Sequence, residues 1–542
     1  MECAVQSFLY YQHKTGDYIL QQKHSSYELV YYKTGYGNTV IGGETFTYKP
    51  GSVAVISPEM IHDEYHKEDG NLYFCLFTLT ADFPLKDGVY EISGEFQKDV
   101  EYLLEIMKRE MAANEFLSKH IINKTFELIL TIADFESKNE DIDVEIERAT
   151  GNNVFDSLKT RFTSGSEPDM FFIDPNEISG FIKEGYIEPL DDYIASEGGL
   201  EFTDLWDFNE EYRYNENGLR DENGKLYGVI KDLSPDFVMV YNKDHIDEYN
   251  RKNPGMKIEY PSETVPMTWY EYLDLARKMT IKNGDEYVRY GTLIDYVPIK
   301  HLMQWVQQTG SSMFNEDYTG LNIVGNEIDP KMKEAFQYLY DLQVSTDGYD
   351  APGKYMATSL INSGDLFNTG SIFSVWYGRW AIPSFKWDLD NLNIGFAPPP
   401  VPERVYGDER DNYGITSGMI GYAMSSRTEK KEKCYRFIEY CMTDGGKIMA
   451  EIGMNVPGNK TIAKNEFINV ADEQVQKINR YYVDYLEKYT HPIINSPYIS
   501  ATKFDNILFQ EMAKAYEGKQ SLDAAIRAAN GRILTETSIN IR

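Results

Sequence analysis

The chain has 542 residues and a formal net charge of −33, and 42% of its residues are hydrophobic. One hydrophobic core rarely organises a chain of this length, so we expect several domains with enough apolar residues to fill their cores. A negative field of this size repels phosphate backbones and anionic headgroups, which argues against nucleic acid and membrane surfaces as partners. Four cysteines at irregular spacing favour free thiols over a disulfide framework or a zinc site.

The opening segment, MECAVQSFLYYQHKTGDY, does not have the pattern of an export signal. It contains no apolar stretch of signal-peptide length and no basic prelude. No later stretch approaches the roughly 18 uncharged residues of a membrane span. Taken as it stands, the sequence predicts a cytoplasmic location.

Short aromatic and β-branched runs follow one another between residues 9 and 79, separated by turn residues such as Pro50-Gly51. Strands at this spacing are typical of an antiparallel barrel or sandwich. From about Gly94 the apolar residues recur at helical spacing, in two successive amphipathic stretches. We therefore predict a β-barrel over residues 1–95 and a helical segment over residues 96–138.

From Asp141 onward, short apolar strands alternate with helical segments. The strand DIDVEIER begins at residue 141, and a helix over residues 153–164, the strand PDMFFID and a helix over residues 177–184 follow it. This alternation predicts a mainly parallel sheet covered by helices. The charged, apolar-poor segment 136–143 is the predicted seam between the two parts of the chain.

Residues 27–66 contain a Gly35-x-Gly37 turn, a Pro50-Gly51 turn before an apolar strand, and Ser57-Pro58 ahead of His62. This stretch resembles the cupin sugar-sensing domain of AraC-type transcription regulators. The resemblance implies an effector pocket near Tyr31 and His62, and a dimer contact through the helices of residues 96–138. Nothing after residue 138 resembles the helix-turn-helix units of those regulators, so DNA binding is not predicted.

The strand over residues 27–32 predicts a pocket without a metal ion. Enzymatic cupins place two histidines and a glutamate on this strand, because a metal needs three or four converging donors. Here the strand reads YELVYY and has no histidine. His62 and His66 are four residues apart and could share a metal, but a role at the end of a strand is favoured. We expect no metal and no cofactor.

Five stretches of the second part share a resemblance and occur in its expected order. They are RFTSGSEPDMFFIDPNEISGFIKEGYIEPLDDYI, KLYGVIKDLSPDFVMVYNKDHID, MTWYEYLDLARKMT, the pair FNTGSIFSVWYGRW and NIGFAPPP, and LFQEMAKAYEGKQSLDAAIRAANGRI. Together they resemble the family-1 sugar-binding proteins of ABC importers. The resemblance implies a non-enzymatic, two-lobed α/β fold of the periplasmic-binding-protein type II. Its first lobe would contain residues 139–241 and 396–455, and its second lobe residues 242–395 and 456–542.

The resemblance also places a sugar site outside the carboxyl ends of the strands, where open α/β sheets bind ligands. Polar side chains there would meet sugar hydroxyls, and aromatic side chains would cover its C–H patches. Trp380, after the small Gly378, is the main stacking candidate, with a core tryptophan as the alternative, and Asp174 and Asp232 have solvated surface carboxylates as theirs. Trp269, after the helix-capping Thr268, is expected to be structural. The expected ligand residues are Asp174, Lys231, Asp232, Tyr241, Asn242, Trp305, Trp376, Arg379, Trp380 and Tyr413.

The chain departs from the resembled family at the start of the second part. The family begins with a strand of the type Ile-Thr-Val-Trp and a helix before the strand that DIDVEIER matches. Here FELILTIADFESKNE could supply the helix, but the first strand is absent and the barrel takes its place. The loss of a central strand costs several backbone hydrogen bonds. The join predicts a deletion fusion or an artefact of sequence assembly.

These features together predict a carbohydrate-binding protein, the substrate-binding component of an ABC sugar importer or a fusion derived from one. Its partners would be a sugar or oligosaccharide and the importer's membrane subunits, and the family is extracytoplasmic. The alternative is a cytoplasmic sugar sensor, related to AraC-type regulators but without a DNA-binding domain. A glycoside hydrolase would need two carboxylates across the scissile bond, and no other motif indicates one. We expect no enzyme activity.

Overall fold

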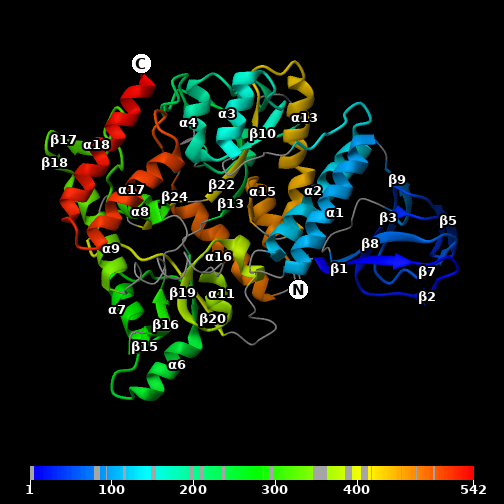
Figure 1. Cartoon of the computed structure of the whole chain (residues 1–542), viewed down its shortest axis with the longest axis horizontal. Coiled ribbons are helices and arrows are strands. Elements are labelled where there is room, and N and C mark those ends of the chain that lie inside the picture. Colours follow the sequence, from blue (N-terminus) through cyan, green and yellow to red (C-terminus); the bar gives the residue numbers. More distant parts are fainter. Residues whose placement is uncertain are drawn as a thin grey trace. The chain divides into compact units, whose positions relative to one another are not determined.

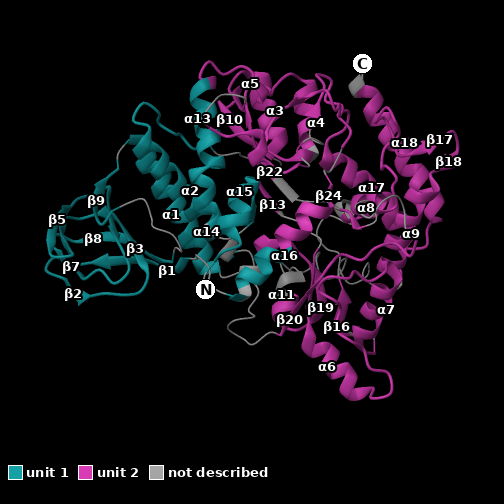
Figure 2. Cartoon of the chain, turned by 180° about the vertical axis from the view of Figure 1, so that it is seen from behind, with its two compact units in different colours: residues 1–152, 432–481 teal, residues 153–431, 482–542 magenta. Residues whose placement is uncertain are grey.

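The chain divides into two compact units, coloured separately in Figure 2. Unit 1 contains residues 1–152 and 432–481, and unit 2 contains residues 153–431 and 482–542. The structure is a computed structural model. It describes residues 5–78, 86–92, 94–113, 118–147, 154–194, 199–207, 209, 213–234, 238–284, 286–292, 298–345, 363–384, 393–404, 413–416, 418–452, 455–470, 473–491 and 495–541.

The first part of unit 1 is rich in strands, as predicted (Figure 1). Its described strands form two sheets, of order β1-β8-β3-β6-β9 and β2-β7-β4-β5. No ladder joins one sheet to the other among these strands, so the predicted barrel is not closed. The strands are β1 (Val5–His13), β2 (Tyr18–Gln22), β3 (Tyr27–Thr34), β4 (Gly37–Ile41), β5 (Glu44–Tyr48), β6 (Ser52–Ile56), β7 (His62–His66), β8 (Gly70–Phe77) and β9 (Gly88–Glu91).

Alternation along β3 divides its side chains between two cores. Leu29 and Tyr31 belong to the core that the five-stranded sheet shares with helices. Val30 and Tyr32 belong to a second core that also contains residues of the other sheet, and the ring of Tyr32 stacks on Tyr48 at 3.6 Å. The two-residue period of a strand explains how one short segment supports both cores.

Helices α1 (Gly94–Ala113) and α2 (Ser118–Lys138) pack against each other beside the five-stranded sheet. Their apolar faces fill the first core, where Leu104 and Phe126 are buried. Two strand tyrosines reach polar groups on α1: Tyr31 donates a hydrogen bond to Glu101 at 2.5 Å, and Tyr73 donates one to Glu105. The predicted pair of helices is therefore present and is anchored to the sheet.

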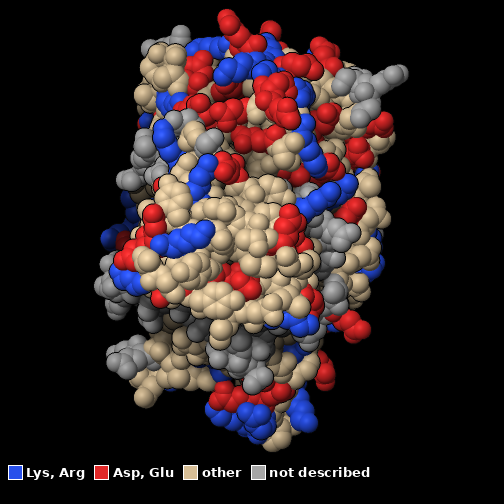
Figure 3. All heavy atoms as spheres, turned by 90° about the vertical axis from the view of Figure 1, so that its right-hand side faces the viewer, with Lys and Arg blue, Asp and Glu red and all other residues tan. Residues whose placement is uncertain are grey.

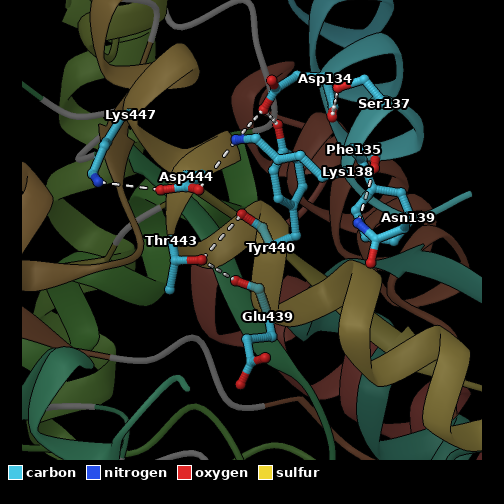
Figure 4. Close-up of polar contacts among 10 residues, drawn as sticks. All are labelled: Asp134, Phe135, Ser137, Lys138, Asn139, Glu439, Tyr440, Thr443, Asp444 and Lys447. Carbon is cyan, nitrogen blue, oxygen red and sulfur yellow. Dashed lines mark hydrogen bonds and ion pairs between the residues drawn. The ribbon is translucent and has the colours of Figure 1, made fainter. Parts of the chain in front are cut away.

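Helix α2 also packs against helices that lie about 300 residues further along the chain, α13 (Lys431–Met442) and α14 (Asp444–Ile452) (Figure 4). The buried Tyr440 hydroxyl donates a hydrogen bond to the Asp134 carboxylate, which also accepts one from Lys138 at 2.8 Å. The ring of Phe135 meets those of Phe437 and Tyr440, with centroids 4.8 and 5.1 Å away. Helix α2 thus packs both into the strand-rich core and against helices from the C-terminal half of the chain.

The strand predicted at DIDVEIER is wrong for its described residues, 141–147, which have no regular secondary structure. Their backbone amides bond to side chains of the two helices instead of to a neighbouring strand. The Val144 amide donates to Glu136 at 2.8 Å, and the Ile146 amide donates to Asp99 at 3.0 Å. These amides are therefore satisfied without a strand ladder, and the segment remains partly exposed. The rest of unit 1 contains β23 (Val456–Pro457), α15 (Lys460–Ile462), a π-helical turn (Ala463–Phe467) and most of α16 (Glu473–Tyr489).

The first sheet of unit 2 contains β10 (Met170–Ile173), β22 (Gly418–Met424) and β13 (Val229–Ser234). The strand β22 lies between the other two and is antiparallel to both. The predicted helix and strand positions around β10 are confirmed by α3 (Val154–Ser164), β10 and α4 (Pro175–Lys183). Smaller neighbouring elements are α5 (Asp191–Ile194), β11 (Arg213–Tyr214) and β12 (Lys225–Leu226).

The second sheet of unit 2 has the order β15-β16-β19-β14-β20, and only its β16–β19 pairing is parallel among those described. The prediction of a mainly parallel sheet is therefore wrong for the described strands, because β14 and β22 each enter their sheet in the opposite direction to their neighbours. The strands are β14 (Met239–Asn242), β15 (Ile281–Asn283), β16 (Glu286–Thr292), β19 (Ile372–Trp376) and β20 (Ile394–Ala397).

Helices cover this second sheet and enclose a large aromatic core that includes Trp269, Trp305 and Phe336. They are α6 (Lys243–Lys252), α7 (Trp269–Met279), α8 (Pro298–Gln308), α9 (Pro330–Ser345), α11 (Ser363–Asn368), α17 (Ala501–Tyr516) and α18 (Leu522–Ile541). The remaining described strands are β17 (Ile323–Val324), β18 (Glu327–Ile328), β21 (Ile415–Thr416) and β24 (Thr490–His491).

Three cysteines in the described residues, Cys75, Cys434 and Cys441, are buried free thiols, as predicted. Among the described helices, none combines the length and apolar character needed to cross a membrane.

Candidate functional site

The carboxyl ends of the parallel strands β16 and β19 meet in a hydrogen-bonded aromatic cluster. Trp376, the last residue of β19, donates its indole N–H to the hydroxyl oxygens of Tyr272 at 3.1 Å and Thr292 at 3.3 Å. Tyr272 also bonds Ser374 at 3.0 Å, and Ser374 donates to the Gly291 carbonyl at 3.0 Å. Since the single proton of Ser374 goes to Gly291, Tyr272 is the donor to Ser374. The network fixes the predicted ligand residue Trp376 at the end of its sheet.

Arg379 and Trp380 follow β19 in a short 3-10 helix, Arg379–Ser384. Arg379 is fully buried, and burial lowers the pKa of its guanidinium to about 10. Trp380 is only half-buried, and its ring meets that of Tyr377 edge-on at 5.5 Å. Trp380 is therefore less buried than Trp376 and Arg379, the other predicted residues at this strand end.

Trp305 lies in α8 and is fully buried. Its ring packs edge-on against Tyr338 at 4.7 Å and stacks on His301 at 5.9 Å. His301 in turn touches Trp376 at 6.0 Å. Trp305 is thus linked to the strand-end cluster through His301.

Trp269 has the structural position expected from its sequence. Thr268 caps α7 and forms a capping box with Glu271, while the Trp269 ring is fully buried and stacks on Tyr338 at 4.8 Å. Its indole N–H donates to Gln308 at 3.1 Å.

Tyr241 and Asn242 lie at the end of β14 and are both buried. The Tyr241 hydroxyl donates to the Pro261 carbonyl at 3.3 Å, and the ring belongs to the aromatic core. The Asn242 side chain accepts from the Asp244 amide at 2.9 Å and so caps α6. Both side chains therefore have structural partners in addition to the ligand role predicted for them.

The ligand residues predicted at the first sheet lie within one of its strands or directly after one. Asp174 directly follows β10, and its carbonyl accepts from the amides of Glu177 and Ile178 at the start of α4. Lys231 and Asp232 lie within β13 and form an ion pair at 3.1 Å, with Asp232 only 4% exposed. The alternative that Asp232 is a solvated surface carboxylate is thus wrong. Tyr413 is half-buried and stacks on Tyr489 at 5.3 Å.

A pocket of about 360 Å³ lies elsewhere in unit 2, lined by the segment between α6 and α7 and by α7 itself. Its lining includes Tyr260, Met267 and Lys278, and it contains none of the predicted ligand residues.

The two residues predicted at the effector pocket of unit 1 have different surroundings. Tyr31 is fully buried beneath α1, and its hydroxyl donates a hydrogen bond to Glu101 of that helix. His62 begins β7 and lies beside His24 and Glu28, and the ligand atoms of these three residues are all within 4.8 Å of one another. His66, at the other end of β7, instead bonds the Tyr48 hydroxyl at 2.5 Å and stacks on His13. The five-residue strand therefore separates His62 from His66.

Sequence reasoning missed His24 and Glu28 because it looked for histidines only within the strand. His24 lies three positions before β3, on the preceding turn. The available signal was the spacing His24-x-x-x-Glu28 at the start of an apolar strand, together with His62 after a Ser57-Pro58 turn.

Comparison with known families agrees with the two-part organisation. The model for the bacterial extracellular solute-binding protein family matches residues 123–448, more than half of the chain. The chain belongs to this family. Residues 4–83 match the model for the AraC-like ligand binding domain. The solute-binding match begins inside α2, the helix that packs against α13 and α14.

Relatives and solved structures support the same assignment. A protein of Brucella abortus (strain 2308) named as a binding protein is 26% identical over 62% of this chain and 74% of its own length. An ABC substrate-binding protein from Listeria monocytogenes, solved with cycloalternan, has a TM-score of 0.59 at 21% identity and covers 76% of this chain and 96% of its own. The sugar-binding protein MalE from Xanthomonas citri has a TM-score of 0.58 at 19% identity, covering 75% and 93%. A maltose/maltodextrin-binding domain from Bdellovibrio bacteriovorus, bound to maltotriose, has a TM-score of 0.53 at 17% identity, covering 78% and 97%. At these identities the structures show that the solute-binding protein shares their fold.

Acidic and basic side chains are interspersed on the face drawn in Figure 3, around a broad area of other residues. Among the residues described on this face, the excess negative charge is therefore not gathered into one patch.

Proposed function

We propose that this solute-binding protein binds an oligosaccharide without chemical conversion, as the substrate-binding component of an ABC sugar importer or a fusion derived from one. The family match over residues 123–448 carries the proposal. The sugar ligands named for the structural neighbours supply the ligand class. No comparison supports the alternative of a regulator-like sensor.

The strand-end cluster supports a sugar ligand on chemical grounds. Trp380 offers a partly exposed side chain, next in sequence to the buried Arg379 and four residues after the hydrogen-bonded Trp376. A fixed aromatic face covers the C–H patches of a sugar ring without losing much side-chain entropy on binding. Asp232, Lys231 and Asp174 are the proposed polar partners, at the strands of the first sheet.

The remaining predicted residues have supporting roles in this proposal. Trp305 supports the cluster through His301, Tyr241 and Asn242 shape the end of β14, and Tyr413 contributes through its pair with Tyr489. The importer's membrane subunits are the proposed protein partners. A dimer through residues 96–138 would have to use faces of α2 other than the one against α13 and α14. The predicted lobe boundaries likewise remain part of the proposal.

Calorimetric titration of the full chain with cycloalternan, maltotriose and a panel of other mono- and oligosaccharides tests the proposal. We expect saturable binding of at least one oligosaccharide, with a change in tryptophan fluorescence. Heat and fluorescence that do not change with any sugar of the panel would contradict it. Substrate turnover, monitored by chromatography of the same sugars, would contradict the absence of catalysis.

A further inference from the structure

Two histidine rings stack on each other between the two sheets of unit 1. His13 is the last residue of β1, in the five-stranded sheet, and His66 is the last residue of β7, in the four-stranded sheet. Their ring centroids are 3.7 Å apart, and the angle between the ring planes is 14°. Both residues are buried, at 1% and 0% exposure. Because no ladder joins the two sheets among the described strands, the stack is a direct contact between their ends.

The chain around the two rings leaves His13 little room to move. A Cβ on Gly70 would lie 2.6 Å from Nε2 of His13, so the ring fits only against a glycine. The turn after β1 also bonds to the backbone of His66. The His66 carbonyl accepts from the Gly16 amide at 2.8 Å, and the His66 amide donates to the Asp17 carbonyl at 3.0 Å. The stack and this turn together join the end of β1 to the end of β7.

The surroundings of both rings favour their neutral form. The Tyr48 hydroxyl lies 2.5 Å from Nδ1 of His66, and burial raises the pKa of this tyrosine, so the hydroxyl keeps its proton and donates it. Nδ1 of His66 therefore accepts, which requires that it carry no proton. Among the described residues, no well-aligned hydrogen-bond partner meets either nitrogen of His13 or Nε2 of His66. Burial, followed by the charge of a protonated His13, lowers the pKa of His66 to about 4, and burial lowers the pKa of His13.

The charged groups around the stack compensate poorly for a proton on it. The titratable groups that face it are Glu64, Tyr48, Lys14, Asp17, Glu68 and Asp69. Oε1 of Glu64 lies 3.2 Å from Nδ1 of His66, but burial raises the pKa of this carboxyl to about 8, so it is uncharged at acid pH. Asp17 and Asp69 favour a proton on the stack, but both already bind Lys14, through its amide at 2.7 Å and its ammonium group at 3.0 Å.

A proton on either ring disturbs this arrangement. On His66 it would set the Nδ1–H and the Tyr48 hydroxyl, two donors, against each other, and protons on both rings would place like charges in contact. We propose that the His13–His66 stack is an acid-sensitive latch, which holds the ends of β1 and β7 together while both rings are neutral and releases them when a ring takes up a proton.

Release of the latch loosens one end of the strand-rich region. It frees the turn after β1 and with it β2, which pairs only with β7 among the described strands. Since the closed form lowers the pKa of both histidines, the latch is fully closed above their ordinary value of about 6.5. Its contribution to stability is lost as the pH falls from there towards about 4.

Hydrogen exchange of the full chain tests the latch. The measured quantity is the protection factor of the amides in β2 and β7, corrected for the intrinsic effect of pH on exchange, at pH 7.5 and pH 5.5. His13→Phe keeps a ring at this position but removes one protonation site. We therefore expect the ratio of its protection to that of the wild type to rise about 10-fold between the two pH values. The titration of Glu64 is common to both proteins and cancels in the ratio.

His245→Phe is the matched control. His245 is also a buried histidine, and burial lowers its pKa to about 4, but it lies in α6 of unit 2. Its protection ratio for the amides of β2 and β7 is expected to be the same at both pH values. A ratio that is likewise constant for His13→Phe would overturn the proposal.

NMR titration of the histidines distinguishes a latch from a merely structural contact. The chain has eight histidines, which are labelled at Cε1. His13→Phe is expected to remove one signal and to raise the pKa of another, since a charged His13 no longer opposes a proton on His66. If every other histidine keeps its pKa, the rings are not coupled and the proposal fails.

The wild-type titration decides the question if His13→Phe does not fold. We expect three histidines with a lowered pKa, and the signal that is lost in His245→Phe identifies one of them. If no other histidine titrates below about 6.5, the latch is overturned.

Discussion

The Tyr440 hydroxyl donates a hydrogen bond to the Asp134 carboxylate, although 306 residues separate the two in the sequence. Both side chains are buried, and burial, followed by the hydrogen bond to Asp134, raises the pKa of Tyr440. We expect Tyr440→Phe to destabilise unit 1 by about 1.5–3 kcal/mol, since a buried hydrogen bond to a charged group is lost. Urea denaturation followed by circular dichroism measures the change.

The control for this substitution is Lys447→Ala, which removes an exposed ion pair with Asp444 at 3.2 Å on the neighbouring helix. Such exposed pairs contribute little, so no measurable change is expected. Equal midpoints for Tyr440→Phe and wild type would show that α2 does not depend on this bond.

Glu64 gives unit 1 a distinct dependence on pH. Burial raises the pKa of its carboxyl from 4.5 to about 8. Between these two values the folded state keeps a proton that the unfolded state has lost, so stability falls as pH rises from about 5 to about 8 and then levels off. The largest slope from this one group is about 1.4 kcal/mol per pH unit.

Glu64→Gln keeps the shape of the protonated side chain and removes its titration. The difference in unfolding free energy between the variant and wild type, measured at several pH values, is therefore expected to grow from pH 5 to pH 8. A difference that is constant across this range would mean that Glu64 titrates normally. The comparison cancels the general repulsion of a chain with a net charge of −33.

Trp380→Ala is expected to weaken sugar binding about 10- to 100-fold, because a stacking ring contributes about 1.5–3 kcal/mol of apolar contact. The measurement is the dissociation constant of the best sugar from the titration above. Trp269→Phe is the matched control, since that tryptophan is fully buried and stacks on Tyr338. If Trp269→Phe weakens binding as much as Trp380→Ala, the core rather than the strand end determines affinity.

Gly37→Ala is expected to disrupt the strand-rich region. A Cβ at this position would lie 2.1 Å from the Tyr48 hydroxyl oxygen and 2.4 Å from the Tyr65 carbonyl oxygen. The backbone cannot yield easily there, so we expect a loss of about 3 kcal/mol or more in unfolding free energy. Gly255→Ala, whose Cβ would meet nothing within 4 Å, is the control, and a similar thermal midpoint for both variants would contradict the expected clash.

Local patterns were sufficient to predict most of the architecture. The short aromatic and β-branched runs before residue 79 and the helical spacing after Gly94 correctly separated strands from helices, and α3, β10 and α4 lie where their patterns placed them. The turn at Gly35 requires the φ of 92° that glycine allows, as the Gly35-x-Gly37 motif indicated.

Tertiary partners account for what the sequence did not reveal. The segment from Asp141 has an apolar alternation typical of a strand, but Glu136 and Asp99 take two of its amide protons. The insertion of β22 between β10 and β13 depends on residues more than 180 positions away from β13. The convergence of His24, Glu28 and His62 likewise depends on the pairing of two turns that lie far apart in sequence.

Helix α2 has consequences for anyone who wishes to divide this protein. Ile122 and Phe126 of α2 share one core with Tyr73 of β8 and with Ile448 of α14. A truncation at residue 138 would deprive the C-terminal fragment of a helix that covers Phe437 and Tyr440, and a truncation before residue 118 would expose the helical side of the N-terminal sheet. If the two halves are expressed separately, each fragment therefore has to include its own copy of α2.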